Sequence, residues 1–312
     1  MANPVLSDAR FFSEEAAFDY VEGQLWPEGP TCPHCGALAD KIGRLTRRSK
    51  PSKKNPEGVA VVGLRKCYAC RETFTVRKGT IFEDSHLPLR MWLQAIHLLC
   101  ASKKGISTRQ LQRMLGCGMK TAWHLGHRIR FAMTPGVKPQ LGGEGKTVEA
   151  DETAITNSRK TKRGPARKKP HTNVLALVER DGPIRSMVID HRGIEVMVNQ
   201  NINRKSRLVT DKGRPYLLVD VAEHESVDHS KYEWARDDVH TNTLEGFFSI
   251  FKRGLIGTYQ HIDTRHFNRY LAEFDFRMNN RTKLGIDDVE RTRRTIRGMV
   301  GKRLMYKDSC VA

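Results

Sequence analysis

The chain has 312 residues, of which 38% are hydrophobic and 29% are charged, enough for two or three compact units with packed cores. Lysine and arginine number 54 against 35 acidic residues, and the resulting net charge of +19 favours a polyanionic partner such as nucleic acid. No apolar run approaches the roughly 18 residues of a membrane-spanning helix, and the first ten residues lack the apolar stretch of a signal peptide. The sequence therefore predicts a soluble, intracellular protein that binds nucleic acid and no membrane.

The N-terminal part combines a short helix with two cysteine pairs. A helix is predicted over Ser13–Gly23, because a serine can cap it and apolar residues recur with helical spacing. Further on, Cys32 and Cys35 form one Cys-x-x-Cys pair, and Cys67 and Cys70 form a second. Two such turns can present four thiolates to one tetrahedral Zn²⁺ ion. The spacing favours a ribbon with a structural Zn²⁺; a redox pair or unrelated thiols are the alternative.

Helical patterns return after the second cysteine pair. Apolar spacing predicts helices over Pro88–Leu99, Ser107–Leu115 and Lys120–Phe131, the last two separated by a Gly-Cys-Gly turn. Two helices joined by a tight turn are typical of a helix-turn-helix, whose second helix reads the major groove of DNA. The expected DNA contacts on that helix are Lys120, Thr121, His124 and Arg128. The alternative is an ordinary helical hairpin with solvated basic residues.

Strand patterns begin beyond a glycine-rich stretch. Strands are predicted over Val148–Thr153, Asn173–Arg180, Ile184–His191 and Arg207–Thr210, and helices over Asn242–Arg253 and Arg265–Asn279. We therefore expect five parts: an N-terminal helix with the zinc ribbon over 1–86, the helix-turn-helix-like region over 87–133, a linker over 134–146, an α/β domain over 147–285, and a basic tail over 286–312.

Acidic residues at strand ends form a candidate catalytic site. Asp151 lies near the end of one predicted strand and Asp211 directly follows another. Carboxylates at adjacent strand ends can hold two Mg²⁺ ions for attack on a phosphodiester. Asn242, Glu245 and Lys252 fall on one face of a predicted helix, so a metal ligand and a phosphate-binding amine can share a cleft.

Each acid also has a simpler interpretation. Asp211 can be a turn residue and Glu245 a solvated partner of Lys252. Other acids compete for the two aspartate positions: Glu149 and Glu152 with Asp151, and Asp220, Asp228 and Asp238 with Asp211.

The order of cysteine pairs, basic helical hairpin and Asp–Asp–Glu resembles that of the ISXO2-like transposases of the IS1595 group of bacterial insertion sequences. The similarity runs from Ser13 to about Arg281. The stretches that carry it are Trp26–Cys35, Gly79–Ser85, Lys103–Ser107, Val148–Glu152, Val209–Asp211, His240–Ser249 and Tyr270–Arg281.

This resemblance implies a ribonuclease-H-like α/β catalytic domain, a mixed sheet flanked by helices, that uses Mg²⁺ or Mn²⁺ to cut and join DNA. Asp151 and Asp211 match the two aspartates of the family. Glu245 matches its third position, where some relatives have Asn or His, and Lys252 matches the basic residue seven places later. Asn242 is a less certain candidate that orients the helix or serves as a ligand.

We therefore expect a DDE-type transposase of the bacterial cytoplasm, associated with the nucleoid, that binds element ends and target DNA as a homodimer or larger oligomer. One departure from the family is a basic insertion over Ser158–Lys169, in which Arg159, Lys160, Lys162 and Arg163 are expected to contact DNA; a solvated loop is the alternative. Two other functions stay open: a DNA-binding regulator without catalysis, and a nuclease that cuts without joining.

Overall fold

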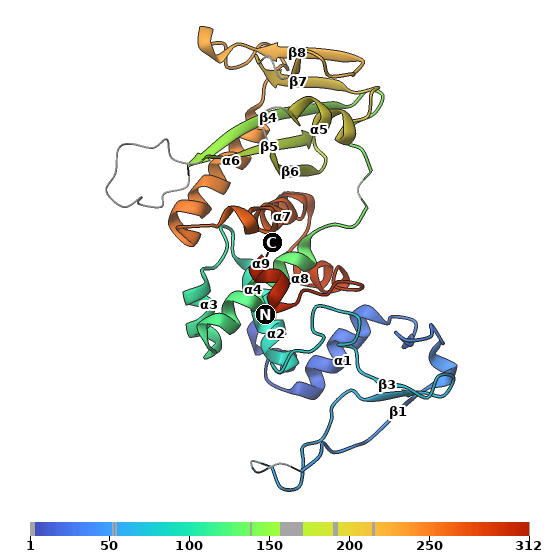
Figure 1. The fold of residues 1–312 in the computed structure, drawn as a ribbon. Coiled ribbons are helices and arrows are strands. Elements are labelled where there is room, and N and C mark those ends of the chain that lie inside the picture. The colour runs from blue at the N-terminus through green and yellow to red at the C-terminus, as the bar shows by residue number, and fades with distance from the viewer. Residues whose placement is uncertain are drawn as a thin grey trace. The chain divides into compact units, whose positions relative to one another are not determined.

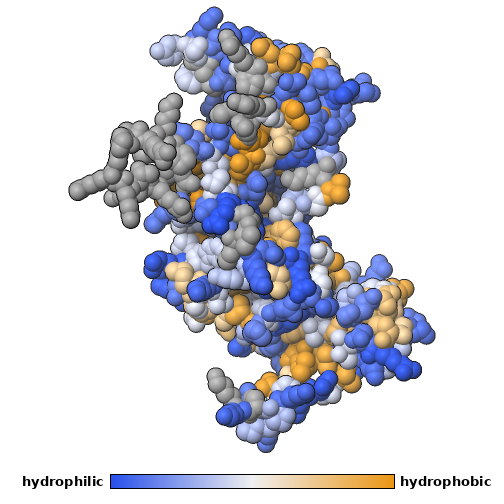
Figure 2. Space-filling view, in the orientation of Figure 1, coloured by the Kyte–Doolittle hydropathy of each residue, from blue (hydrophilic) through white to orange (hydrophobic). Residues whose placement is uncertain are grey.

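The computed structural model describes residues 4–51, 53, 55–137, 139–156, 171–189, 193–213 and 216–311. The chain divides into two compact units, each described by itself below (Figure 1). The first contains Met1–Ser102, Thr108–Met133 and Ile286–Val311, and the second contains Lys103–Ser107 and Thr134–Gly285. Hydrophilic residues cover most of the face seen in Figure 2. Among the described residues, no helix combines the length and apolar character needed to cross a bilayer.

The N-terminal helix and a small sheet form the beginning of the first unit. Helix α1 (Glu14–Leu25) starts where the sequence predicts, because the Oγ of Ser13 accepts a hydrogen bond from the backbone N–H of Ala16 at 3.3 Å. Strands β1 (Ile42–Arg44), β2 (Arg65–Cys67) and β3 (Thr73–Phe74) form an antiparallel sheet in the order β1-β2-β3. A buried ion pair between Glu22 and Arg65 ties α1 to β2.

Helices make up the rest of the first unit. They are α2 (Leu89–Ala101), α3 (Thr108–Leu115), α4 (Met119–Met133), α8 (Asp288–Arg297) and α9 (Tyr306–Val311). The three predicted helices of this region correspond to α2, α3 and α4. Their cores contain fully buried side chains such as Trp92, Leu125 and Ile129.

The C-terminal segment differs from the predicted basic tail. Asp287 caps α8 by accepting a hydrogen bond from the N–H of Glu290 at 2.7 Å, and α8 contacts α2. The guanidinium of Arg291 is buried and donates to the backbone oxygen of Cys100 at 2.7 Å, while Ile296 is fully buried. Arginines dominate the composition of α8, while threonine and isoleucine contribute to its small buried face.

A five-stranded sheet forms the centre of the second unit. Its strands are β4 (Thr147–Thr156), β5 (His171–Glu179), β6 (Ile184–Ile189), β7 (Arg207–Asp211) and β8 (Glu223–Val227), in the order β6-β5-β4-β7-β8. Strands β4, β5 and β6 are antiparallel neighbours, whereas β7 runs parallel to β4 and β8 parallel to β7. The four predicted strands are present. Strand β8 was missed because its sequence, Glu-His-Glu-Ser-Val, is polar, as suits an edge strand.

Helices cover both faces of this sheet (Figure 1). On one face, α6 (Asn242–Gly254) and α7 (Phe267–Asn279) bury phenylalanines such as Phe251 and Phe274 against Val174 and Ala176 of β5. On the other face, α5 (Ile194–Asn201) packs against residues of opposite parity such as Leu175. The second unit is thus a mixed α/β domain flanked by helices. Short helical turns lie at Val5–Ser7, Ala9–Phe11, Ala39–Lys41, His229–Lys231, Leu255–Tyr259, Thr264–His266 and Thr282–Leu284.

Candidate metal centres and nucleic-acid interface

The two cysteine pairs come together at the small sheet of the first unit. The Sγ atoms of Cys32, Cys35, Cys67 and Cys70 all lie within 4.8 Å of one another. Among the described residues, this is the one group of three or more His, Cys, Asp or Glu side chains gathered so closely. Local backbone geometry builds the first turn, because the N–H of Gly36, at a φ of 75°, donates to the carbonyl of Cys32 at 2.9 Å.

The sulfur positions fit a tetrahedral Zn²⁺ ion. The distances from Cys32 to Cys70 and from Cys35 to Cys67 are both 3.7 Å. A tetrahedron with zinc–sulfur bonds of about 2.3 Å separates its sulfurs by about 3.8 Å. The backbone N–H of Cys70 lowers the pKa of the Cys67 thiol to about 7, which favours the thiolate that binds metal. With four protein ligands and no open position, the site suits structural rather than catalytic Zn²⁺.

The two candidate aspartates lie side by side on the sheet of the second unit. Strands β4 and β7 are parallel and pair Ala150 with Thr210, so Asp151 and Asp211 occupy the next positions along neighbouring strands. Both aspartates share a face of the sheet with Val209, which packs against Val239 just before α6. The sheet therefore directs these two carboxylates toward the side that α6 covers.

Helix α6 presents the other candidates on one stripe. Asn242, Glu245 and Lys252 are exposed, while Leu244 and Phe251 on the opposite side are fully buried. The helix contacts β4 and β5, which fixes the exposed stripe beside the aspartate face. The position of the stripe agrees with the prediction from helical spacing.

Electrostatics link Asp151 to its acidic neighbours. Burial, the largest cause, and the charges of Glu152, Asp211 and Glu245 together raise the pKa of Asp151 to about 7. Like charges that disfavour one another's ionisation mark a place where a cation would be stabilised. The donor set, all carboxylate oxygens, suits Mg²⁺ or Mn²⁺. The carboxylates of Asp151, Asp211 and Glu245 are nevertheless less tightly gathered than the sulfurs of the cysteine cluster.

The competing acids make other contacts. Glu152 lies on the opposite face of β4 and accepts a hydrogen bond from the buried hydroxyl of Tyr216, whose pKa burial raises. Asp228 pairs with Lys212 at 3.0 Å, and Asp238 pairs with Arg207. These partners explain the residues without a metal.

Glu149 was considered from the sequence only as a competitor of Asp151, and its bonds in the fold were not foreseen. It is fully buried and bonded to Thr243 at the start of α6 and to Arg180. The alternation of side chains along a strand could have indicated it, because Glu149 lies two residues before Asp151 and therefore points to the same face of the sheet.

The predicted DNA contacts on α4 divide into two groups. Lys120 is exposed, and together with Thr121 and His124 it lines a cavity of about 410 Å³ within the first unit. Arg128 lines the same cavity but is buried, with its guanidinium 5.2 Å from the ring centre of Trp92 and donating to the carbonyl of Glu83. The prediction that Arg128 contacts DNA is therefore corrected: this long side chain supports the fold, because α4 is covered on more than one side. Arg159, Lys160, Lys162 and Arg163 lie outside the described residues.

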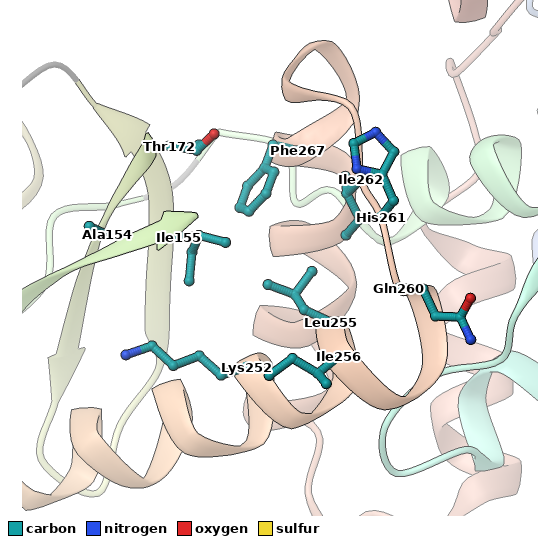
Figure 3. Close-up of a pocket in the computed structure, with 10 residues that line it drawn as sticks. All are labelled: Ala154, Ile155, Thr172, Lys252, Leu255, Ile256, Gln260, His261, Ile262 and Phe267. Atoms are coloured by element: carbon teal, nitrogen blue, oxygen red, sulfur yellow. The ribbon is translucent and has the colours of Figure 1, made fainter. Parts of the chain in front are cut away.

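Lys252 also borders a cavity of about 280 Å³ within the second unit. Figure 3 shows its side chain extending from α6 toward the strand that carries Ala154 and Ile155, while Leu255, Ile262 and Phe267 line the apolar part. The side chain of Lys252 therefore lines the same cavity as Ala154 and Ile155 of the sheet.

Two family models match the chain. Residues 12–73 match the transposase zinc-ribbon domain, and residues 140–279 match the ISXO2-like transposase domain. The first match covers all four cysteines, and the second covers the aspartate face of the sheet with α6 and α7. The chain is therefore similar to ISXO2-like transposases over both the segment of its cysteine pairs and the domain of its carboxylate face.

A protein relative supports the same assignment. The chain is 24% identical over 291 residues to an uncharacterized protein in transposable element ISH50 of Halobacterium salinarum. The aligned region covers 86% of this chain and 91% of that protein. The match to a transposase zinc-ribbon domain makes the four-cysteine cluster a zinc-ribbon site, and the match to the ISXO2-like transposase domain implies a DNA-processing enzyme.

Proposed function

We propose that the protein is a DDE-type transposase that binds insertion-sequence ends and catalyses metal-dependent cleavage and strand transfer of DNA. The observation that carries the proposal is the juxtaposition of Asp151 and Asp211 on neighbouring parallel strands, with Glu245 on the helix that covers their face. Its presence inside a transposase family domain separates this acidic cluster from ordinary surface carboxylates.

A ribonuclease-H-like fold is the second part of the proposal. It is supported by the strand order β6-β5-β4-β7-β8, in which three antiparallel strands are followed by two parallel ones, and by helices on both faces. In this sheet Asp211 ends β7 and Asp151 lies in the middle of the longer strand β4 rather than near its end, and the parallel pairing brings these two distant residues together.

Asp151, Asp211 and Glu245 would hold two Mg²⁺ or Mn²⁺ ions. When bound, such ions activate the attacking oxygen and stabilise the leaving oxygen of an in-line displacement at phosphorus. In the first step water would attack a phosphodiester, leaving a 5′-phosphate and releasing a 3′-hydroxyl; in the second, that hydroxyl would attack a phosphodiester of target DNA and displace the 3′-hydroxyl of the target strand. Lys252 would hold a phosphate beside the reacting strand, and the exposed Asn242 would orient this end of α6 or add a ligand.

The first unit would recognise the element ends. Lys120, Thr121 and His124 at the start of α4 are the proposed contacts, following the arrangement in which the second helix of a hairpin enters the major groove. Because two element ends must be joined, a dimer or larger oligomer on DNA is part of the proposal.

The experiment is a strand-transfer assay on DNA that carries the sequences flanking this gene. We expect the wild type to cut and join in Mg²⁺, and Asp151→Ala, Asp211→Ala or Glu245→Ala to lower both rates about a thousandfold, equivalent to ~4 kcal/mol, while DNA binding persists. The matched control is Asp220→Ala, since Asp220 is an acid of the same unit paired with Arg204 at 3.0 Å. Binding without cutting would identify a regulator, and cutting without joining a nuclease; either result would overturn the proposal.

A further inference from the structure

Glu149 is a buried carboxylate beside the candidate catalytic face. It lies on β4 two residues before Asp151, and its side chain is 0% exposed. A buried carboxylate costs free energy unless its charge is paired and its oxygens are hydrogen-bonded. Its bonding partners therefore indicate what it does.

One set of partners belongs to the first turn of α6. Oε2 of Glu149 accepts a hydrogen bond from the backbone N–H of Thr243 at 3.2 Å, and Oε1 accepts one from the Thr243 hydroxyl at 3.0 Å. Within the described residues, Thr241, the residue before the helix, makes no side-chain capping bond. Glu149 thus supplies from a different strand the acceptor that a helix N-terminus requires, and its charge suits the positive end of the helix dipole.

The second partner, Arg180, neutralises the carboxylate and holds the chain that leads into α6. Its Nε lies 3.2 Å from Oε1 of Glu149, and its guanidinium donates to the backbone oxygens of Asp238 at 2.5 Å and His240 at 3.2 Å. Asp238 also forms an ion pair with Arg207 at the start of β7. Strands β4 and β7 and the residue just after β5 are therefore all bonded to the segment at which α6 begins.

We propose that Glu149 and Arg180 are positioning residues that fix where α6 starts on the sheet and thereby set Glu245 against Asp151. Residues rotate about 100° for each step along a helix, so a slip of one residue would turn Glu245 off the face of the aspartates. Glu149 and Asp151 share one strand, and Thr243 and Glu245 share one helix turn. The bond from Glu149 to Thr243 therefore transmits the register of β4 directly to the third carboxylate.

The role proposed for Glu149 differs from that of a metal ligand. Both oxygens of Glu149 are engaged with Thr243 and Arg180, and the group is fully enclosed. This proposal rests on the proposed function in one respect only, namely that Asp151 and Glu245 act together on DNA.

The test compares Glu149→Gln with Glu273→Gln in the full-length chain with zinc retained. Glu273 is also 0% exposed and paired with an arginine, Arg277, but it lies on α7. For Glu149→Gln we expect hydrogen-exchange protection of the amides from Thr243 to Phe247 to fall about tenfold or more, and the maximal cleavage rate to fall about 10–100-fold with unchanged DNA affinity. For Glu273→Gln we expect no selective change at the amides from Thr243 to Phe247, because the other bond of Glu273 is to Tyr259, beyond the end of α6.

A conservative series at Thr243 keeps the test decisive if Glu149→Gln does not fold. Thr243→Ser retains the hydroxyl and should resemble the wild type, whereas Thr243→Val removes one bond to Glu149 and should reduce both protection and cleavage. Unchanged α6 protection in Glu149→Gln and Thr243→Val would overturn the positioning role, as would wild-type cleavage in both. Reduced protection in a chain whose wild type cuts no DNA would uphold the helix anchor and overturn the proposed function instead.

Discussion

The two candidate metal centres gather their ligands in different ways. In the first unit, four sulfurs already lie at tetrahedral distances, with separations of 3.7 Å between Cys32 and Cys70 and between Cys35 and Cys67. In the second unit, Asp151, Asp211 and Glu245 share one face, but their carboxylates are less closely gathered. A closed ligand set suits an ion that stabilises a fold, whereas a looser, mutually repelling set leaves positions for substrate and water.

The same contrast is visible in the pKa values of Cys67 and Asp151, of which the first is lowered and the second raised toward 7. Backbone hydrogen bonds, that from Cys70 first, lower the pKa of Cys67 to about 7, whereas burial and the neighbouring thiols raise the pKa of Cys70 to about 12, so the charged form is favoured at one of these two ligands before metal binds. Burial and neighbouring carboxylates raise the pKa of Asp151 to about 7, so the charged ligand is disfavoured until a cation compensates it. In the first centre, backbone N–H groups favour the metal-binding form of Cys67; in the second, the charged form of Asp151 depends on a bound cation.

Loss of zinc should have the largest effect. Binding of structural Zn²⁺ contributes about 10–16 kcal/mol in small zinc domains, so Cys67→Ser should unfold the segment that carries β1, β2 and β3. Elemental analysis should give about one zinc per wild-type chain and none in the variant, and amide exchange should show the local unfolding. The control is Cys117→Ser, because Cys117 lies outside the cluster. A metal-free wild type with an intact ribbon would contradict the prediction.

Replacing Asp151 by Asn should have an effect of intermediate size, and it should stabilise the fold where loss of zinc destabilises it. The raised pKa means that the folded chain binds more protons than the unfolded chain between about pH 4 and 7, so the free energy of unfolding falls as pH rises through this window. At 1.36 kcal/mol per pH unit the loss is at most about 4 kcal/mol. Without added Mg²⁺, Asp151→Asn should therefore be more stable than the wild type at pH 8, with a smaller difference at pH 5.

Denaturant titrations at both pH values measure this difference. Added Mg²⁺ should stabilise the wild type and not the variant, since a ligand stabilises only the state that binds it. Asp220→Asn provides the exposed control. An equal stability difference at pH 5 and pH 8 would show that the Asp151 carboxylate is not the titrating group.

Local patterns predicted more of the carboxylate face than of the helical unit. Helical spacing placed Glu245 and Lys252 on an exposed stripe because Leu244 and Phe251 have an apolar sheet to cover. The same reasoning was wrong for Arg128, since spacing shows which residues share a face but not which neighbours cover that face. The role of Glu149 could not be predicted for a related reason: its bond to Thr243 joins residues 94 positions apart and depends on the tertiary fold.

Replacing Lys252 by Ala should have the smallest effect and sharpen the distinction between ion ligands and their surroundings. Lys252 is exposed on the stripe of Glu245 and extends toward β4 in Figure 3. Loss of one phosphate contact should slow cleavage about tenfold, equivalent to ~1.4 kcal/mol, without altering the Mg²⁺ concentration that gives half-maximal rate. Glu245→Gln should raise that concentration, because it weakens an ion ligand. Arg253→Ala is the matched control, since the adjacent Arg253 donates to the backbone of Ser249 at 3.1 Å. A shift in the Mg²⁺ requirement of Lys252→Ala would mean that this amine shapes the ion site itself, and it would contradict the assignment of Lys252 as a phosphate contact only.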